Sequence, residues 1–193
     1  MKRVLFGMAA ALVCCIAIAG STEYVSKTGS GTTAATVYWP ADAQKTARLV
    51  GVIATSDKAA SVISLRTGTT AYTITVTNAT TTSINQWLNT TNGLVASGVV
   101  VLQKPDGTCY SSTIAAGCAE TNMVILASGG FGVVAGVGDQ MYLMSDATSI
   151  KLGATTLSTH GPAIYVGNRG RPVRMVVDGT SACSIDAATA AYE

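Results

Sequence analysis

Few residues in this chain are of a type that performs covalent chemistry. His160 is the only histidine, so a Ser-His-Asp triad would have to include it. No serine has the Gly-x-Ser-x-Gly context of an activated nucleophile, and the segment 159–162 (THGP) is typical of a turn. Asp139 and Asp146, the nearest carboxylates in the sequence, fall at opposite ends of one expected strand, which suits acid–base catalysis poorly. We therefore expect a protein that is not an enzyme and that folds normally with His160→Ala.

The cysteines predict a covalent cross-link. Cys109 and Cys118 enclose the turn-compatible segment SSTIAAG, and in an exported chain this spacing indicates a disulfide that closes a surface hairpin. A loop of this size would add about 2–3 kcal/mol of stability. Cys183 then has no partner in this pairing. It is either a buried free thiol, or it takes the place of Cys109 or Cys118 in the disulfide.

The sequence offers no site for a metal or an organic cofactor. Cysteine ligands with His160 would lack the C-x-x-C spacing of a zinc site. The glycine-rich run 129–138 (GGFGVVAGVG) continues into a strand instead of the helix that a dinucleotide-binding loop requires. Its glycines indicate strands that bend sharply or pack closely.

Two segments of the C-terminal half are candidates for a protein interface. The run 141–144 is apolar on both alternating faces, so at least two of its residues need cover beyond one sheet face. Its interface candidates are Met141, Tyr142 and Met144. The segment 168–174 would supply a polar rim of arginines, or alternatively a solvated turn. Its candidates are Arg169, Arg171 and Arg174. A strand buried within its own fold is the competing interpretation of the apolar run.

Aromatic side chains suggest a second kind of contact. Trp39, Trp87 and Tyr110 are the candidates for stacking on a carbohydrate, although aromatic residues also fill cores.

Short strands must position all of these residues. Segment 48–76 predicts three strands, at 48–55, 61–67 and 72–77, joined by two polar turns. Similar strands follow at 94–103, 108–114, 123–128, 140–145, 150–152, 155–157, 163–166 and 173–178, after a first one at 36–39. About ten short strands without helical periodicity predict an all-β, single-domain antiparallel β-sandwich of jelly-roll type over residues 36–193. Residues 20–35 are expected to form a flexible lead-in or an edge segment.

Charge excludes one class of partner. Only 11% of the residues are charged, and removing Lys2 and Arg3 from the 12 basic residues leaves 10, against 10 acidic residues. A neutral mature chain has no electrostatic footprint for nucleic acid, and it resists self-association weakly. A homo-oligomer or a protein partner is therefore expected.

The first 19 residues have the organisation of a secretory signal peptide. Lys2 and Arg3 precede an apolar stretch, and Ala17-Ile18-Ala19 supplies small residues for cleavage. Two alternatives stay open: a retained membrane anchor, and a lipoprotein leader acylated at Cys15. The expected location is secreted or at the cell surface, meaning the periplasm or outer surface in a bacterium.

The leading hypothesis is an exported, non-enzymatic structural protein that assembles into a cell-surface, appendage or particle structure. The alternative is a β-sandwich module that binds carbohydrate or another surface. A hydrolase that uses His160 ranks third.

The mature protein is expected to begin near Gly20, because the small-residue cleavage motif ends there. Intact-mass analysis of the exported protein measures this directly. A retained Met1, or a mass that includes acyl chains on Cys15, would contradict it.

Overall fold

The computed structural model describes residues 22–120, 122–152 and 156–193, and these residues form strands and loops without a helix. The predicted all-β class with antiparallel pairing is confirmed, and the predicted leader lies outside the described residues. The strands are β1 (Glu23–Gly31), β2 (Ala34–Trp39), β3 (Ala47–Ser56), β4 (Val62–Thr73), β5 (Asn85–Trp87), β6 (Val99–Gln103), β7 (Cys109–Glu120), β8 (Met123–Leu126), β9 (Gln140–Met144), β10 (Thr148–Lys151), β11 (Thr156–Val166), β12 (Val173–Asp178) and β13 (Cys183–Tyr192).

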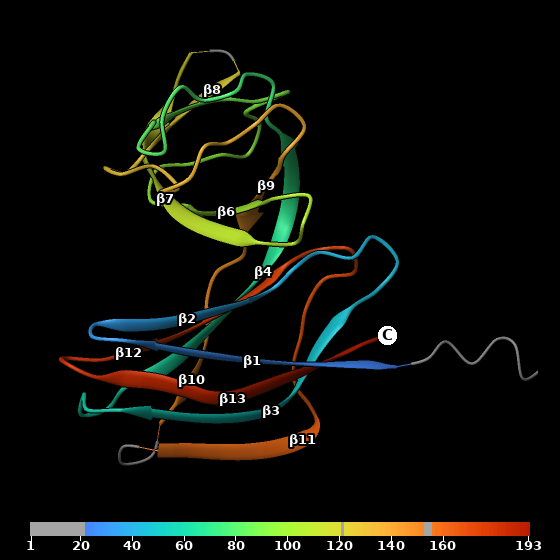
Figure 1. The fold of residues 1–193 in the computed structure, drawn as a ribbon, viewed down its shortest axis with the longest axis vertical. Helices are drawn as coiled ribbons and strands as arrows, with labels where there is room; N and C mark the ends of the chain where they lie inside the picture. The colour runs from blue at the N-terminus through green and yellow to red at the C-terminus, as the bar shows by residue number, and fades with distance from the viewer. Residues whose placement is uncertain (1–21, 121, 153–155) are drawn as a thin grey trace, which may run out of the picture.

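Two antiparallel layers form the lower lobe in Figure 1, which we call the sandwich. One layer has the strand order β1-β13-β3-β11, and the other contains β2, β12, β4 and β10. Alternating residues of both layers fill a common core that includes Trp39, Leu49, Leu65, Met175 and Ile185. Apolar residues at alternate positions of each strand therefore face the other layer, as in other two-layer sandwiches.

The upper lobe is a small closed barrel, which the sequence did not predict. Its strand order is β4-β9-β6-β7-β8-β5. An antiparallel bridge between Ile74 and Leu88, with the bond from Thr75 N–H to Trp87 O (2.8 Å), joins the last strand back to the first. Closure gives this lobe a core of its own, centred on Tyr72, Leu102, Ile114, Leu126 and Met141.

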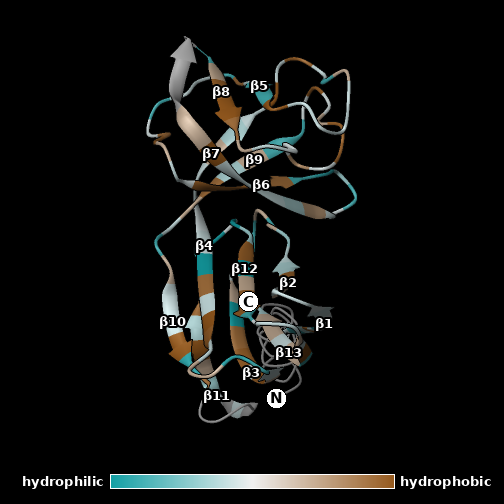
Figure 2. Cartoon of the chain, turned by 90° about the vertical axis from the view of Figure 1, so that its left-hand side faces the viewer, coloured by the Kyte–Doolittle hydropathy of each residue, from teal (hydrophilic) through white to brown (hydrophobic). Residues whose placement is uncertain are grey.

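Strand β4 belongs to both lobes (Figures 1 and 2). Its first half pairs with β12 and β10, and its second half pairs with β9. The turn expected at 68–71 is therefore wrong: the chain continues as one strand, with a register shift between Gly68 and Thr70. A side chain at position 68 would collide with Pro172, since its Cβ would lie 2.9 Å from the proline Cδ. The glycine thus marks close packing inside a strand and not a turn.

The glycine-rich run forms a loop that covers the barrel. Gly129, Gly130, Gly132 and Gly138 all have positive φ, and Phe131 is buried in the barrel core between them. At Gly130 a Cβ would lie 2.3 Å from the Ser83 carbonyl oxygen, so only glycine fits. These glycines serve a folded loop, and not the bent strands that the sequence suggested.

Both edges of the four-stranded layer are irregular. β1, which begins within the segment expected to be a lead-in or an edge, shifts register against β13 between Lys27 and Gly29. β11 shifts register against β3 between His160 and Tyr165, across a segment that contains Pro162. Irregular edges of this kind hinder pairing with a further strand.

Because the lobes share β4, we expect them to unfold together. Leu102→Ala removes a fully buried side chain from the barrel core and should cost about 2–5 kcal/mol. In a Trp87→Phe background, the fluorescence of the remaining Trp39 reports on the sandwich alone. Leu102→Ala should therefore lower the denaturant concentration at the midpoint of the transition that Trp39 reports. Leu65→Ala, the equivalent change in the sandwich core, is the matched comparison. Two separate transitions, with the Trp39 midpoint unmoved by Leu102→Ala, would show independent lobes.

Candidate functional site

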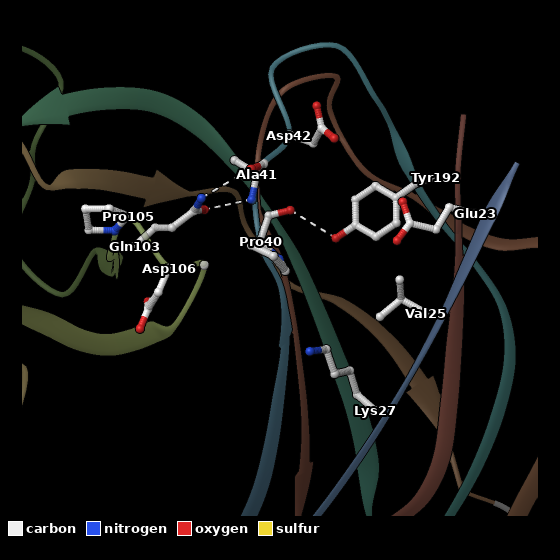
Figure 3. A pocket seen from close by; sticks show the side chains of 11 residues that line it. Glu23, Val25, Lys27, Pro40, Ala41, Asp42, Gln103, Pro105, Asp106 and Tyr192 are labelled. Atoms are coloured by element: carbon white, nitrogen blue, oxygen red, sulfur yellow. Dashed lines mark hydrogen bonds between the residues drawn. The ribbon is translucent and has the colours of Figure 1, made fainter. Parts of the chain in front are cut away.

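A hollow of about 370 Å³ lies between the two lobes (Figure 3). β1 contributes Glu23, Val25 and Lys27 to its wall, and the end of β13 contributes Tyr192. The loop after β2, the end of β6 and the turn between β6 and β7 supply the remaining lining residues: Pro40, Ala41, Asp42, Gln103, Pro105, Asp106 and Gly107.

Most polar groups in this inter-lobe hollow already serve the fold. The Gln103 side chain accepts a bond from Ala41 N–H (2.7 Å) and donates one to Ala41 O (3.2 Å), which ties the barrel to the sandwich. Tyr192 donates to Pro40 O at 3.0 Å. Thr108 N–H donates to Asp106 Oδ1 (2.8 Å) and lowers the pKa of that carboxyl. Most polar groups of the inter-lobe hollow therefore stabilise the fold, and few of them are left to bind a ligand.

The backbone places two of the residues considered for catalysis in different lobes, His160 in the sandwich and Asp139 in the barrel. β11 places His160 opposite Gly51 of β3, and the histidine side chain lies outside what the structure describes. Asp139 is buried in the barrel, where it accepts bonds from Lys104 Nζ (2.6 Å) and Gly136 N–H (2.8 Å). Within the described residues, no three His, Cys, Asp or Glu side chains gather as a metal site would require.

The structure contradicts the predicted disulfide between Cys109 and Cys118. Both residues belong to the single strand β7, and Cys109 has a free thiol. An extended strand rises about 3.3 Å per residue, so two residues nine positions apart on β7 are well beyond the about 7 Å that a disulfide can bridge, even with the register shifts of this strand. The segment expected to turn continues the ladder with β6 and β8 instead. Cys183 is buried and also free.

The expected apolar interface is likewise wrong, because the fold itself buries it. Met141 is fully buried in the barrel core, and Tyr142 and Met144 pack with Val101 between the lobes. β9 is covered on both faces, one by the barrel interior and one by the junction. The competing interpretation, a strand buried within its own fold, therefore describes this segment.

The arginines of the candidate rim separate into different roles. Arg169 is exposed and its Nε donates to Gln44 O at 3.3 Å. The guanidinium carbon of Arg171 lies 5.7 Å from the centre of the Tyr142 ring, within cation–π range. Arg174 is half-buried, and its Nε is buried without a hydrogen-bond partner.

Of the three aromatic candidates for stacking, only Trp87 is exposed. Trp39 is fully buried, and its Nε1 donates to Val25 O at 3.1 Å, so it serves the sandwich core. Tyr110 is half-buried against the barrel core. Trp87 is 36% exposed on the outer face of β5, where the burial of Asn85, Gln86 and Trp87 alternates out, in, out.

Trp87 lines a second hollow, of about 430 Å³, which we call the Trp87 hollow. Its exposed apolar side chains are Val76 (48%), Ile84 (40%) and Trp87. The rest of the lining is uncharged and largely polar: Thr77, Asn78, Ala79, Thr82, Ser83 and Asn85. Apart from Trp87, these residues were not recognised from sequence, because Ile84-Asn85-Gln86-Trp87 lacks the period-two alternation that marks a short strand, and the side chain that β5 buries is the polar Gln86.

The chain was also compared with protein-family models, curated proteins and solved structures, and nothing matches. No helix among the residues described is long and apolar enough to cross a membrane. The arrangement of the site must therefore be interpreted from its own chemistry.

Cys109 is expected to stay reduced and unreactive in the folded protein. Burial raises the pKa of its thiol to about 12, so at pH 8 roughly one molecule in ten thousand carries the reactive thiolate. Burial also raises the pKa of Cys183. Iodoacetamide should modify both at least about 100-fold more slowly in the native protein than in urea, as measured by peptide mass mapping. Rapid native labelling of Cys109, or a Cys109–Cys118 peptide in a non-reduced digest, would contradict this.

Proposed function

We propose that this protein is an exported, non-enzymatic binding module that attaches to uncharged carbohydrate through the Trp87 hollow. The observation that carries the proposal is the composition of this hollow: exposed apolar surface is surrounded by hydroxyl and amide groups, and none of the lining residues is charged. A charged ligand would find no counter-ion there, whereas a sugar has apolar C–H faces for an indole and hydroxyls for amides.

Strand geometry supports the same ligand class. Asn85 and Trp87 are two positions apart on β5, so their side chains project from the same outer face. The Asn85 amide has two donors and one acceptor and, among the described residues, no intramolecular hydrogen bond. Stacking on Trp87 and hydrogen bonding to Asn85 could thus engage one sugar ring together.

The arrangement of the lobes favours the barrel as the binding part. Glu23 and Tyr192, near the two ends of the described mature chain, pair in the sandwich. A leader or lipid anchor that preceded β1 would therefore attach at the sandwich, whereas β5, which contributes Asn85 and Trp87 to the Trp87 hollow, lies in the other lobe (Figure 2).

Assembly into a surface structure is the second candidate function. The interface first expected for it is buried, but the exposed Val76, Ile84 and Trp87 also suit docking of a second copy. Near-zero mature charge favours such association as well.

Trp87→Ala should weaken binding to an uncharged polysaccharide at least tenfold, or about 1.4 kcal/mol, because it removes the stacking surface. Affinity electrophoresis against soluble starch, xyloglucan and galactomannan measures this. Tyr24→Ala is the matched control, since Tyr24 is the exposed aromatic residue of the sandwich (68%).

Two outcomes separate the candidates. If none of the three polysaccharides is bound, or if Trp87→Ala and Tyr24→Ala behave alike, the carbohydrate proposal fails. If light scattering then shows a mass that grows with concentration in the wild type but not in Ile84→Glu, assembly is the function of this surface.

A further inference from the structure

Two arginines lie directly opposite each other on the outer face of the sandwich. Arg66 of β4 pairs in register with Arg174 of β12, and Tyr38 of β2 is opposite Arg174 on the other side. Leu65 and Met175, adjacent to the arginines in sequence, are fully buried in the sandwich core. Strand alternation therefore places both arginines on the face away from that core.

A third arginine approaches the same place. A Cβ built on Gly68, two positions beyond Arg66, would lie 3.3 Å from the Cβ of Arg171. The barrel stands beside this group, because Tyr38 Oη donates to Ser111 Oγ of β7 at 2.7 Å and Arg171 lies over Tyr142 of β9. The arginines thus gather where the sandwich face meets the barrel.

No carboxylate in the described part of the chain forms an ion pair with these three arginines. Ion pairs within 4 Å form at Lys45, Arg48, Lys58 and Lys104, but none involves Arg66, Arg171 or Arg174. Like charges directly opposite across strands are destabilising, and arginine cannot lose its proton.

The hydrogen bonds of the pair are incomplete as well. Arg66 Nη1 donates to Ser145 O at 2.7 Å, whereas Arg174 Nε is buried with no acceptor. An orphan buried donor is rare in folded proteins and costs about 1–3 kcal/mol. A bound anion would supply both the missing hydrogen-bond acceptor and the missing negative charge.

We infer that Arg66 and Arg174, assisted by Arg171, form a binding site for an oxyanion group of the phosphate, sulfate or carboxylate type. Guanidinium groups present parallel N–H donors that match two oxygens of such a group, and one anion between two arginines converts repulsion into attraction. The site is separate from the Trp87 hollow, so this inference does not depend on the proposed carbohydrate ligand.

The experiment compares thermal unfolding in inorganic phosphate, sodium sulfate, sodium acetate and sodium chloride at one ionic strength and pH 7. Phosphate and sulfate stabilise many proteins without binding at a site, so the informative quantity is the difference between wild type and variant. The variants are Arg66→Gln and Arg174→Gln, and Arg169→Gln is the control on the exposed neighbour.

We expect at least one oxyanion to raise the Tm of the wild type and of Arg169→Gln by about 2 °C or more above chloride. This increment should disappear in Arg66→Gln and Arg174→Gln. In chloride the Arg66→Gln variant should melt at the wild-type temperature or higher, because the substitution relieves repulsion. If Arg66 served only packing, Arg66→Gln would instead lower the Tm in chloride.

The comparison of the four salts also identifies the class of anion. A response to phosphate and sulfate but not to acetate assigns a tetrahedral oxyanion, and a response to acetate assigns a carboxylate. Equal increments in the wild type and both site variants would overturn the inference, as would a loss of several degrees for Arg66→Gln in chloride with an unchanged phosphate response.

Discussion

The hydrogen-bonded continuity of β4 is the constraint on which the rest of the structure depends. One strand supplies a ladder to β12 and β10 and then, past the register shift at Gly68, a ladder to β9. The sandwich and the barrel are therefore not two domains on a linker but two cores built on one shared element. Any tilt between the lobes would have to bend this strand.

Side chains across the junction reinforce that continuity. Gln103 bonds to the Ala41 backbone as a neighbouring strand would, and Tyr38 reaches from β2 to Ser111 of β7. The apolar cluster of Val101, Tyr142 and Met144 fills the space between. This explains why the run that looked like an interface from sequence is buried: the partner it needs is the other half of the same chain.

Local alternation predicted most strand positions, the all-β class and the antiparallel pairing, because each depends on short-range sequence pattern. Alternation carries no information on closure, so the barrel was missed. β13 was missed because its run of alanine and threonine (CSIDAATAAY) has weak strand propensity, and the partners on both sides of it, β1 and β3, are what make it a strand. Cysteine spacing failed as a guide because a disulfide requires a turn that the long strand β7 does not contain. Trp87 was recognised, but Val76 and Ile84 join it only through folding of the barrel.

The irregular edges of the four-stranded layer bear on how identical molecules avoid one another. A chain with nearly balanced charge has little long-range repulsion to keep copies apart. The barrel closes its sheet on itself, and the two exposed edges of the layer are interrupted, at Lys27 to Gly29 in β1 and around Pro162 in β11. At these two edges, backbone geometry hinders the addition of a further strand, a task that surface charge performs in many proteins, and it does so independently of salt and pH.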